Sequence, residues 1–329
     1  HPHCRRQRQM CIRDSIMSAP SSGGASRDGY GRGLLRIAQD PRVVVLEADL
    51  GKSTKSCHFR DEYPDRTVSL GIAEQNMMLV AAGMASSGKI PFASTFAIFT
   101  ERAFEQVRNG IARPGLPVHI CGSHGGIHTG TDGSSAQSIE DLAIYRTIPK
   151  MTVIHPCDDI SAEELTVQLV DLNGPSYMRT ARNKVPRMYE DGSKLRIGSG
   201  SVLREGGDLA IISCGVMVGV AISAAETLSR EGISCTVVDM HTIKPLDIEL
   251  IAKLSDSCGA FVSAEDHSVI GGLGGALSEW LSTNTSTPLE MVGVRDNFGQ
   301  SGASSELMEL MGLNEAGICE AARRAISRK

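Results

Sequence analysis

The sequence predicts an α/β protein of two domains, each a mostly parallel sheet with helices on both faces. Three observations support this prediction. Short apolar runs alternate with helical patterns, which is typical of parallel strands joined by helices. A length of 329 residues leaves room for two hydrophobic cores. The stretch over residues 187–200 is polar, contains Gly and Ser, and lacks strong periodicity, so it is expected to be a linker between the two domains.

The first alternating pattern covers residues 27–186 and predicts the first domain. Its apolar runs are expected to be strands at residues 43–48, 67–70, 90–94, 117–122, 152–155 and 176–179. The helical patterns between them predict helices at residues 75–86, 100–113, 139–148 and 160–172.

The second domain is expected over residues 201–329. Strands are predicted at residues 209–213, 234–239 and 260–264, and helices at residues 218–230 and 275–282. The motif Asp239-Met-His-Thr-Ile-Lys-Pro245 should end a strand. Asp247 is then expected to cap the next helix, since its carboxylate can accept an unpaired helical N–H.

Residues 1–26 are expected to be a disordered, non-native extension. The first sixteen residues contain one acid and no hydrophobic period, and they carry four arginines: Arg5, Arg6, Arg8 and Arg13. A mitochondrial targeting peptide would also be amphipathic, so Met17 is the expected natural start. The Ser-, Gly- and Ala-rich stretch at 18–26 is expected to be a flexible lead-in.

Composition disfavours several classes of protein. A net charge of -5 gives no electrostatic footprint for nucleic acid. No apolar run approaches the ~18–20 residues that span a bilayer. The nine cysteines lack any C-x-x-C pair, which fits reduced thiols in a cytoplasmic protein.

The most informative motifs are Gly71-Ile-Ala-Glu-Gln-Asn-Met77 and Ser94-Thr-Phe-Ala-Ile-Phe99. Glu74 could be an acid that simply favours a helix start. It could also be a carboxyl that gives a proton to a ring nitrogen. Phe96 and Phe99 could belong to the core, but they follow a strand end, where ligand sites of α/β proteins gather. A carboxyl beside two aromatic rings is the minimum set for binding an aminopyrimidine.

A glycine-dense loop, Gly122-Ser-His-Gly-Gly-Ile-His-Thr-Gly-Thr-Asp-Gly133, follows the fourth predicted strand. Its glycines are consistent with ordinary turns. His124 and Asp132 are costly to hold in so flexible a loop unless a ligand orders them.

These motifs resemble the transketolases, thiamine-diphosphate enzymes that move two-carbon ketol units between sugar phosphates. The resemblance runs from about Arg27 to the C-terminus and includes residues 237–245 and 298–302. It implies a pyrimidine-binding domain followed by a transketolase C-terminal domain.

The resemblance also implies a cofactor site. Glu74 would be the catalytic acid, bonded to a ring nitrogen of the aminopyrimidine. Phe96 and Phe99 would stack on that ring, and Asp49 would lie near the thiazolium. Some members carry a third aromatic residue where this chain has Arg102.

A substrate site is implied on the same grounds. His124 would help to bind the substrate phosphate, and Asp132 would bond the C2 hydroxyl of the sugar. A guanidinium offers paired donors to a phosphate dianion, and the phosphate set would be completed by Arg27, Ser53 and Arg179. The family often has His or Gln four residues after the aspartate, where this chain has Ala136, so the donor preference stays open.

No Gly-Asp-Gly motif occurs in the chain. In transketolases this motif, with a later Asn, holds Mg²⁺ and the diphosphate in an N-terminal half of similar length. We therefore expect no metal ligands here and a separate N-terminal subunit that supplies them, in an α2β2 assembly acting on sugar phosphates.

Three alternatives remain open. The beta subunits of 2-oxoacid dehydrogenases share the glutamate and the C-terminal domain but lack the arginine/histidine phosphate set. 1-Deoxyxylulose-5-phosphate synthases usually carry Asp-Arg-Ala-Gly in place of Ser123-His-Gly-Gly126. A non-catalytic partner would need none of the site residues in combination.

Overall fold

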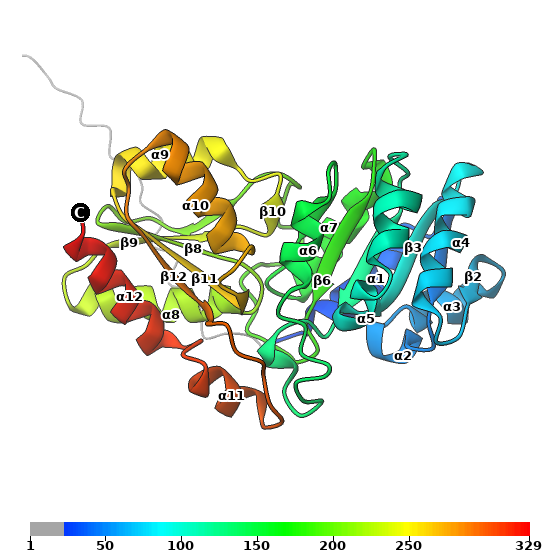
Figure 1. The fold of residues 1–329 in the computed structure, drawn as a ribbon, viewed down its shortest axis with the longest axis horizontal. Helices are drawn as coiled ribbons and strands as arrows, with labels where there is room; N and C mark the ends of the chain where they lie inside the picture. Colours follow the sequence, from blue (N-terminus) through cyan, green and yellow to red (C-terminus); the bar gives the residue numbers. More distant parts are fainter. Residues whose placement is uncertain (1–22) are drawn as a thin grey trace, which may run out of the picture.

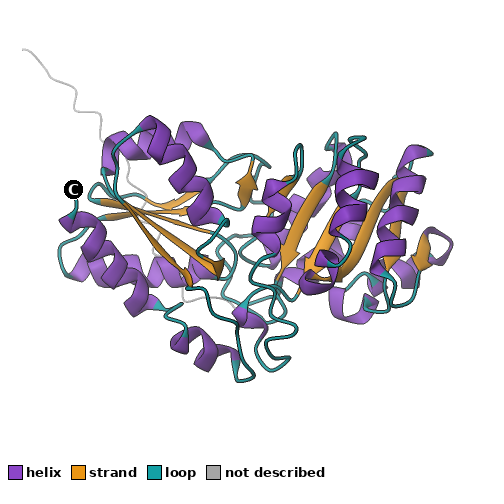
Figure 2. Ribbon diagram, in the orientation of Figure 1, coloured by secondary structure: helices purple, strands orange, loops and turns teal. Residues whose placement is uncertain are grey.

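Two sheets, one in each half of the chain, organise the fold (Figure 1). The computed structural model describes residues 23–329. The first sheet has the strand order β10-β5-β6-β4-β3-β1-β2, and the second has the order β12-β11-β8-β9-β7. Among the named strands of residues 23–329, β10 and β7 pair with their neighbours in an antiparallel sense, and the others are parallel. Helices cover both faces of each sheet (Figure 2), so the predicted fold class is confirmed.

The first half contains six strands of the first sheet. These are β1 (Val43–Glu47), β2 (Thr67–Ser69), β3 (Ile90–Phe96), β4 (His119–Ser123), β5 (Thr152–Ile154) and β6 (Ser176–Thr180). The α-helices are α1 (Ser26–Arg36), α2 (Gly51–Thr54), α3 (Cys57–Glu62), α4 (Glu74–Ser86), α5 (Ala97–Glu101), α6 (Asp141–Thr147) and α7 (Asp159–Gln168). A π-helix, η2 (Gln106–Ala112), and the 3₁₀ turns η1 (Pro64–Arg66), η3 (Ile127–Thr129) and η4 (Leu169–Asp171) complete it.

Strand β1 shows why its continuous apolar run forms a central strand. Successive side chains of a strand point to opposite faces. Val43 and Val45 pack in a cluster with residues of α1, α3 and α7, whereas Val44 and Leu46 pack in another with residues of α4 and η2. A parallel strand covered on both faces is expected to be apolar throughout.

The second half has the same layered construction. Its strands are β7 (Ser201–Arg204), β8 (Leu209–Ser213), β9 (Cys235–Asp239), β10 (Thr242–Lys244), β11 (Phe261–Ser268) and β12 (Leu289–Val294). Its helices are α8 (Met217–Arg230), α9 (Ile248–Cys258), α10 (Leu273–Asn284), α11 (Ser304–Leu310) and α12 (Glu315–Ser327). The side chain of Asp247 accepts a hydrogen bond from the Leu250 N–H, which confirms the expected cap of α9.

The two halves share a sheet. Strand β10 comes from the second half but lies antiparallel to β5 at the edge of the first sheet. The ammonium group of Lys244 donates to the carbonyl oxygens of Arg146 and Ile148 at 2.8 and 2.6 Å. One apolar cluster also contains residues of both sheets, including Leu46 and Ile212. Packing and strand pairing therefore join the two halves.

Two local predictions were wrong. The single helix expected at 100–113 is divided into α5 and the π-helix η2. The carbonyl oxygen of Thr100 accepts from the Tyr145 hydroxyl and from the Ala103 N–H, both at 3.1 Å, which is a tighter i to i+3 bond than an α-helix makes. The lead-in was expected to extend to residue 26, but Gly24 pairs with Val185 and Ser26 begins α1. The other expectations for the N-terminal extension concern residues 1–22, which lie outside the described residues.

Candidate functional site

Most of the predicted site residues follow the carboxyl ends of adjacent parallel strands. Asp49 follows β1, Glu74 follows β2, Phe96 ends β3 and His124 follows β4. Strands β4, β3, β1 and β2 are consecutive neighbours in the sheet. Loops after the carboxyl ends of parallel strands meet at one edge, where ligands of open α/β sheets bind. The topology therefore gathers residues that lie up to 75 positions apart in sequence.

Glu74 is the first residue of α4 and is only 2 % exposed. Among residues 23–329, its one ion pair joins Oε2 to Arg102 Nη1 at 3.4 Å, and the Arg102 side chain is 52 % exposed. A buried carboxylate normally has several close donors. Glu74 is thus a buried acid with a single long contact to a partner that can move into solvent.

The predicted aromatic pair is stacked. The ring centroids of Phe96 and Phe99 are 5.7 Å apart with an interplanar angle of 11°. The His124 ring stacks on Phe96 at 3.9 Å, and the Arg102 guanidinium carbon lies 5.0 Å from the centroid of Phe99. Arg102 therefore links the rings to Glu74 at the position where some family members have a third aromatic residue.

His124 is held in a strained backbone conformation. Its φ of 62° is uncommon for a residue with a side chain. Its Nδ1 lies 2.8 Å from the Ser123 hydroxyl, and the ring is buried. Burial lowers the pKa of His124 to about 3, and the nearby charges of Arg27 and Arg182 act in the same direction. The imidazole is therefore neutral at physiological pH.

A cavity of about 600 Å³ opens beside this edge. Its walls come from both halves of the chain, and the lining residues include Arg27, Arg182, Lys184, Ser304 and Ser305. Burial lowers the pKa of Arg27, and the like charge of Arg182 contributes to this shift. An anion between the two guanidinium groups would relieve their repulsion.

The second arginine of the predicted phosphate set needs a correction. Arg179 is fully buried and does not line the cavity. Its guanidinium forms a two-pronged ion pair with Asp141 and donates to the carbonyl oxygens of Ser138 and Asp266. Burial alone would lower the pKa of Arg179, but the carboxylate of Asp141 raises it above its usual value. A substrate cannot reach Arg179 without disrupting the core.

Arg182 was missed by the sequence analysis. It lies just after β6, and its Nη1 donates to the Thr129 carbonyl and the Thr131 hydroxyl, both at 3.1 Å. The same Nη1 is 3.3 Å from Asp132 Oδ1, which is on the predicted substrate loop. The motif Met178-Arg-Thr-Ala-Arg182 contains both arginines, and their positions relative to the end of the strand could have distinguished them. No sequence motif indicated Ser304 and Ser305, which lie in the second half of the chain.

Ser53, Asp132 and Asp49 lie around the site in different ways. The carbonyl oxygen of Ser53 accepts from Arg27 Nη1 at 3.0 Å. Asp132 is exposed and pairs with Arg182, which lines the cavity. Asp49 is exposed directly after β1, with a φ of 58°. Their ligand contacts stay predictions.

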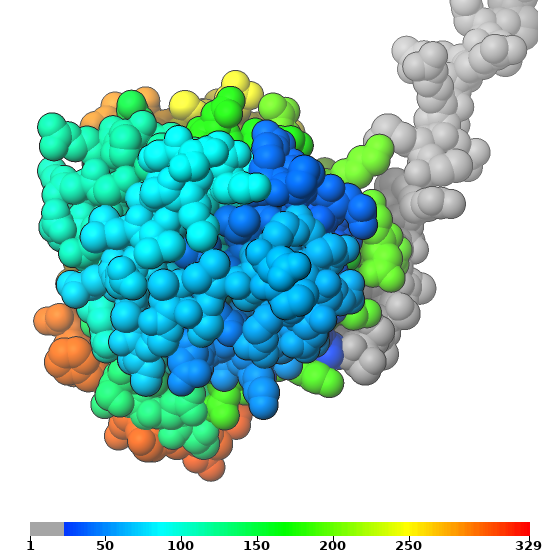
Figure 3. Space-filling view, turned by 90° about the vertical axis from the view of Figure 1, so that its right-hand side faces the viewer, coloured from blue at the N-terminus to red at the C-terminus, as the bar shows by residue number. Residues whose placement is uncertain are grey.

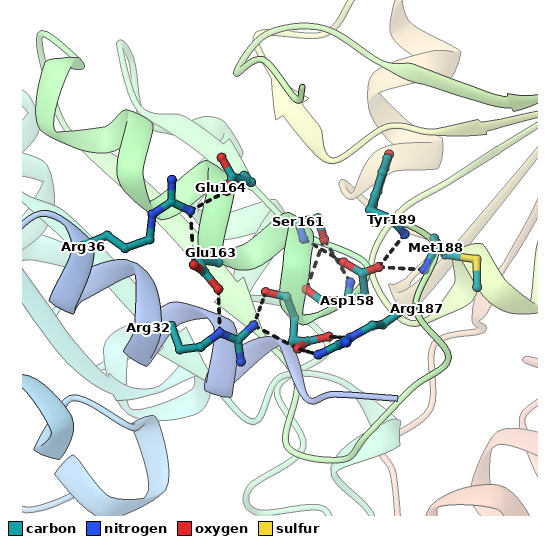
Figure 4. A network of polar contacts seen from close by, with 10 residues as sticks. Arg32, Arg36, Asp158, Ser161, Glu163, Glu164, Arg187, Met188 and Tyr189 are labelled. Atoms are coloured by element: carbon teal, nitrogen blue, oxygen red, sulfur yellow. Dashed lines mark hydrogen bonds and ion pairs between the residues drawn. The ribbon is translucent and has the colours of Figure 1, made fainter. Parts of the chain in front are cut away.

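Helix α1, which carries Arg27, is fixed by the polar network in Figure 4. Arg32 on α1 and Arg187 in the linker both bind the carboxylate of Asp159, at 2.9 and 2.7 Å. Asp158 caps α7 and also accepts the main-chain N–H groups of residues 188 and 189. The Ser26 hydroxyl also accepts the Ala181 N–H at 2.7 Å, next to Arg182. This network fixes the positions of Arg27 and Arg182 relative to each other.

Comparison with known proteins defines the class. The chain matches the transketolase pyrimidine-binding domain over residues 25–188 and the transketolase C-terminal domain over residues 198–318. The chain belongs to the transketolase family. The expected family resemblance is confirmed.

Individual relatives belong to the same family. The chain is 42% identical to a transketolase C-terminal section of Methanocaldococcus jannaschii, covering 89% of this chain and 94% of that protein. It is 41% identical to the 6-deoxy-6-sulfo-D-fructose transketolase subunit SqwH of a Clostridium species, covering 92% and 95%. Human transketolase is 34% identical over 92% of this chain but only 49% of its own length.

Among solved structures, the chain resembles a split-gene transketolase described as an inactive beta4 tetramer. The TM-score is 0.88 and the identity 44%, with 93% of this chain and 100% of that chain covered. The chain therefore has the domain content of separately encoded C-terminal transketolase sections. Within residues 23–329 there is no cluster of three or more metal-ligating side chains, and no helix long and apolar enough to cross a membrane.

Proposed function

We propose that this chain is the C-terminal subunit of a thiamine-diphosphate-dependent transketolase. The complex would transfer a two-carbon ketol unit from a ketose phosphate to an aldose phosphate. A separate N-terminal subunit would complete each site and supply the ligands of Mg²⁺ and the diphosphate, in an α2β2 assembly in the cytoplasm. The single observation that carries the proposal is the buried carboxylate of Glu74 beside the stacked pair Phe96 and Phe99.

The residues present fit the pyrimidine end of this cofactor. Glu74 has a buried carboxylate that pairs with the half-exposed Arg102, so a ring nitrogen could take the place of Arg102. Phe96 and Phe99 offer aromatic surfaces at the same strand edge, and aromatic rings prefer offset-stacked contacts. When bound, thiamine diphosphate supplies a carbon nucleophile that forms and breaks bonds beside a carbonyl. Glu74 holds or moves one proton at its carboxyl group, which is general acid–base catalysis.

The cavity supports recognition of a sugar with a terminal anion. Arg27 and Arg182 bring two positive charges to one wall, and His124 nearby is neutral and available as a hydrogen-bonding group. Asp132 lies on the same glycine-rich loop as His124, and its carboxylate could accept a hydrogen bond from a sugar hydroxyl. A phosphate and a sulfonate share the tetrahedral oxyanion that guanidinium groups bind. The relative named for 6-deoxy-6-sulfo-D-fructose makes sulfonated ketoses a specific second substrate class to test.

Reconstitution tests the proposal. The chain is produced with and without an N-terminal transketolase subunit that carries Gly-Asp-Gly and Asn. We expect ketol transfer only in the mixture, and negligible binding of thiamine diphosphate and Mg²⁺ to the isolated chain by calorimetry. The proposal is wrong if the mixture, with cofactor bound, transfers no ketol unit from phosphorylated or sulfonated ketoses. Micromolar cofactor binding to the isolated chain would contradict the role of the partner.

A further inference from the structure

A carboxylate from the second half of the chain caps a turn in the glycine-rich loop of residues 122–133. Asp266 lies in β11 and is only 1 % exposed. Its Oδ1 accepts the N–H of Ile127 at 2.8 Å, and its Oδ2 accepts the N–H of His128 at 3.0 Å. These residues begin the 3₁₀ turn η3, and the first N–H groups of a helical turn have no partner within it. The two donors lie 139 and 138 positions from the acceptor.

The loop is shaped to receive this carboxylate. Gly126 has a φ of +81°, and a Cβ at this position would lie 2.2 Å from Asp266 Oδ2. The carbonyl oxygen of Asp266 accepts from Arg179 Nη1 at 2.5 Å, while Arg179 Nη2 donates to the carbonyl oxygen of Ser138 at 2.9 Å. Arg179 therefore fixes the main chain of Asp266 and the segment just beyond the loop. The buried arginine that does not reach the cavity supports the residue that holds the loop.

The same loop builds the cavity wall. Thr129, Gly130 and Thr131 line the cavity, and Arg182 donates to the first and third of them. Ser304, at the start of α11, donates to the carbonyl oxygen of His128 at 2.9 Å. Figures 1 and 3 show the loop beside the chain segment that leads into α11, at the lower edge of the molecule. A displacement of η3 would move the partners of Arg182.

We propose that Asp266 is a positioning residue that orders the glycine-rich loop and thereby sets the affinity for the anionic sugar substrate. The inference rests on the proposed function and assigns the second half of the chain a part in substrate recognition. A glycine-rich loop loses more backbone entropy on ordering than other segments. A loop ordered before binding does not lose this entropy when substrate arrives, so preorganisation increases affinity. Asp266 bonds the turn η3 and does not contact Glu74, Phe96 or Phe99, so cofactor binding should change less than substrate binding.

The test uses Asp266→Asn and Asp266→Ala in the complex with the N-terminal subunit. Asparagine keeps one acceptor for the two N–H groups, and alanine keeps none. We expect KM for ribose 5-phosphate as acceptor to rise about tenfold in Asp266→Ala and less in Asp266→Asn. The turnover number and the affinity for thiamine diphosphate should change less than about threefold. Hydrogen exchange at Ile127 and His128 should become faster in both variants, because their acceptor is weakened or lost.

Two further variants separate positioning from general stability. Glu279→Gln removes the ion pair with Arg146, which also joins the two halves but does not touch the loop. It should leave KM and exchange of the loop amides unchanged. Gly126→Ala should reproduce the effect of Asp266→Ala, because the added Cβ displaces the carboxylate.

Each outcome decides the proposal. Unchanged KM and unchanged loop exchange in Asp266→Asn and Gly126→Ala would overturn it, including the case where Asp266→Ala does not fold. An equal rise of KM in Glu279→Gln would also overturn it, since the effect would then follow any loss of contact between the halves. If the wild-type complex transfers no ketol unit, the proposed function fails. The exchange measurement then still decides whether Asp266 orders the loop.

Discussion

Arg179 and Arg182 lie three positions apart at the end of β6, in two regions of opposite character. Arg179 belongs to the region between the two sheets, where its side chain is 1 % exposed and pairs with the buried Asp141. Arg182 belongs to the strand-end region, where its side chain is 32 % exposed and lines a cavity together with a second arginine, Arg27. In the first region the positive charge is matched by a carboxylate and by main-chain oxygens. In the second, two positive charges face open space.

This difference distinguishes charges that serve the structure from charges that can serve a ligand. A buried charge survives in a core only when partners compensate its lost hydration. A charge that keeps incomplete partners near a cavity is available to a ligand. Glu74 follows the second pattern despite its burial, because it pairs at 3.4 Å with the half-exposed Arg102. The following predictions test this distinction.

The largest expected effect concerns Glu74. In the reconstituted complex, Glu74→Ala and Glu74→Gln should lower the ketol-transfer rate by at least about 10²-fold, because the proton-transferring carboxyl is lost. The free energy of unfolding of the chain should not fall, since residues placed for function often cost stability. Steady-state rates and urea unfolding measure the two quantities. Near-normal turnover in a folded variant would mean that Glu74 is only a helix-start acid.

Stability should respond most strongly at Arg179. Arg179→Met leaves the charge of Asp141 buried without its partner and should destabilise the chain by about 3–5 kcal/mol. Arg182→Ala, the matched control three positions along, should cost less than about 1 kcal/mol because its ion pair with Asp132 is solvent-exposed. Denaturant midpoints of both variants provide the comparison. Equal losses in the two variants would remove the distinction between the regions.

Asp239 is a buried acid away from the cavity whose carboxyl group is incompletely hydrogen-bonded. It is fully buried and accepts from the Tyr189 hydroxyl at 2.8 Å, and no hydrogen bond from residues 23–329 reaches its Oδ1. Burial raises the pKa of Asp239 to about 7. Between about pH 4 and 7 this carboxyl is protonated in the folded state but ionised in the unfolded state. The free energy of unfolding therefore falls as the pH rises through this range. Relative to wild type, Asp239→Asn should gain on the order of a few kcal/mol over that range, measured by urea unfolding. A constant difference across pH would contradict the shift.

Local sequence patterns were sufficient to predict the fold class and part of the site. The apolar run of β1 and the cap at Asp247 depend on neighbouring residues, and both were predicted. Strand β10 was not, because its pairing with β5 joins segments about ninety positions apart. Arg179 was misassigned because its partners Asp141 and Asp266 lie 38 and 87 positions away. Burial of a charge is decided by such distant partners, which spacing along the chain does not reveal.

The smallest of these effects, at Arg182, tests whether the cavity binds the anionic group of the substrate. A charge-assisted bond to an anion contributes about 1.5–3 kcal/mol, or roughly tenfold to a hundredfold in binding. The measurement is kcat/KM of the complex for a phosphorylated acceptor divided by that for glycolaldehyde, in wild type, Arg182→Ala and Arg179→Lys. We predict that the ratio falls at least about tenfold in Arg182→Ala and falls less in Arg179→Lys, because Arg179 reaches the loop only indirectly, through Asp266. An unchanged ratio in Arg182→Ala, or a fall only in Arg179→Lys, would contradict the assignment of the cavity as the substrate anion site.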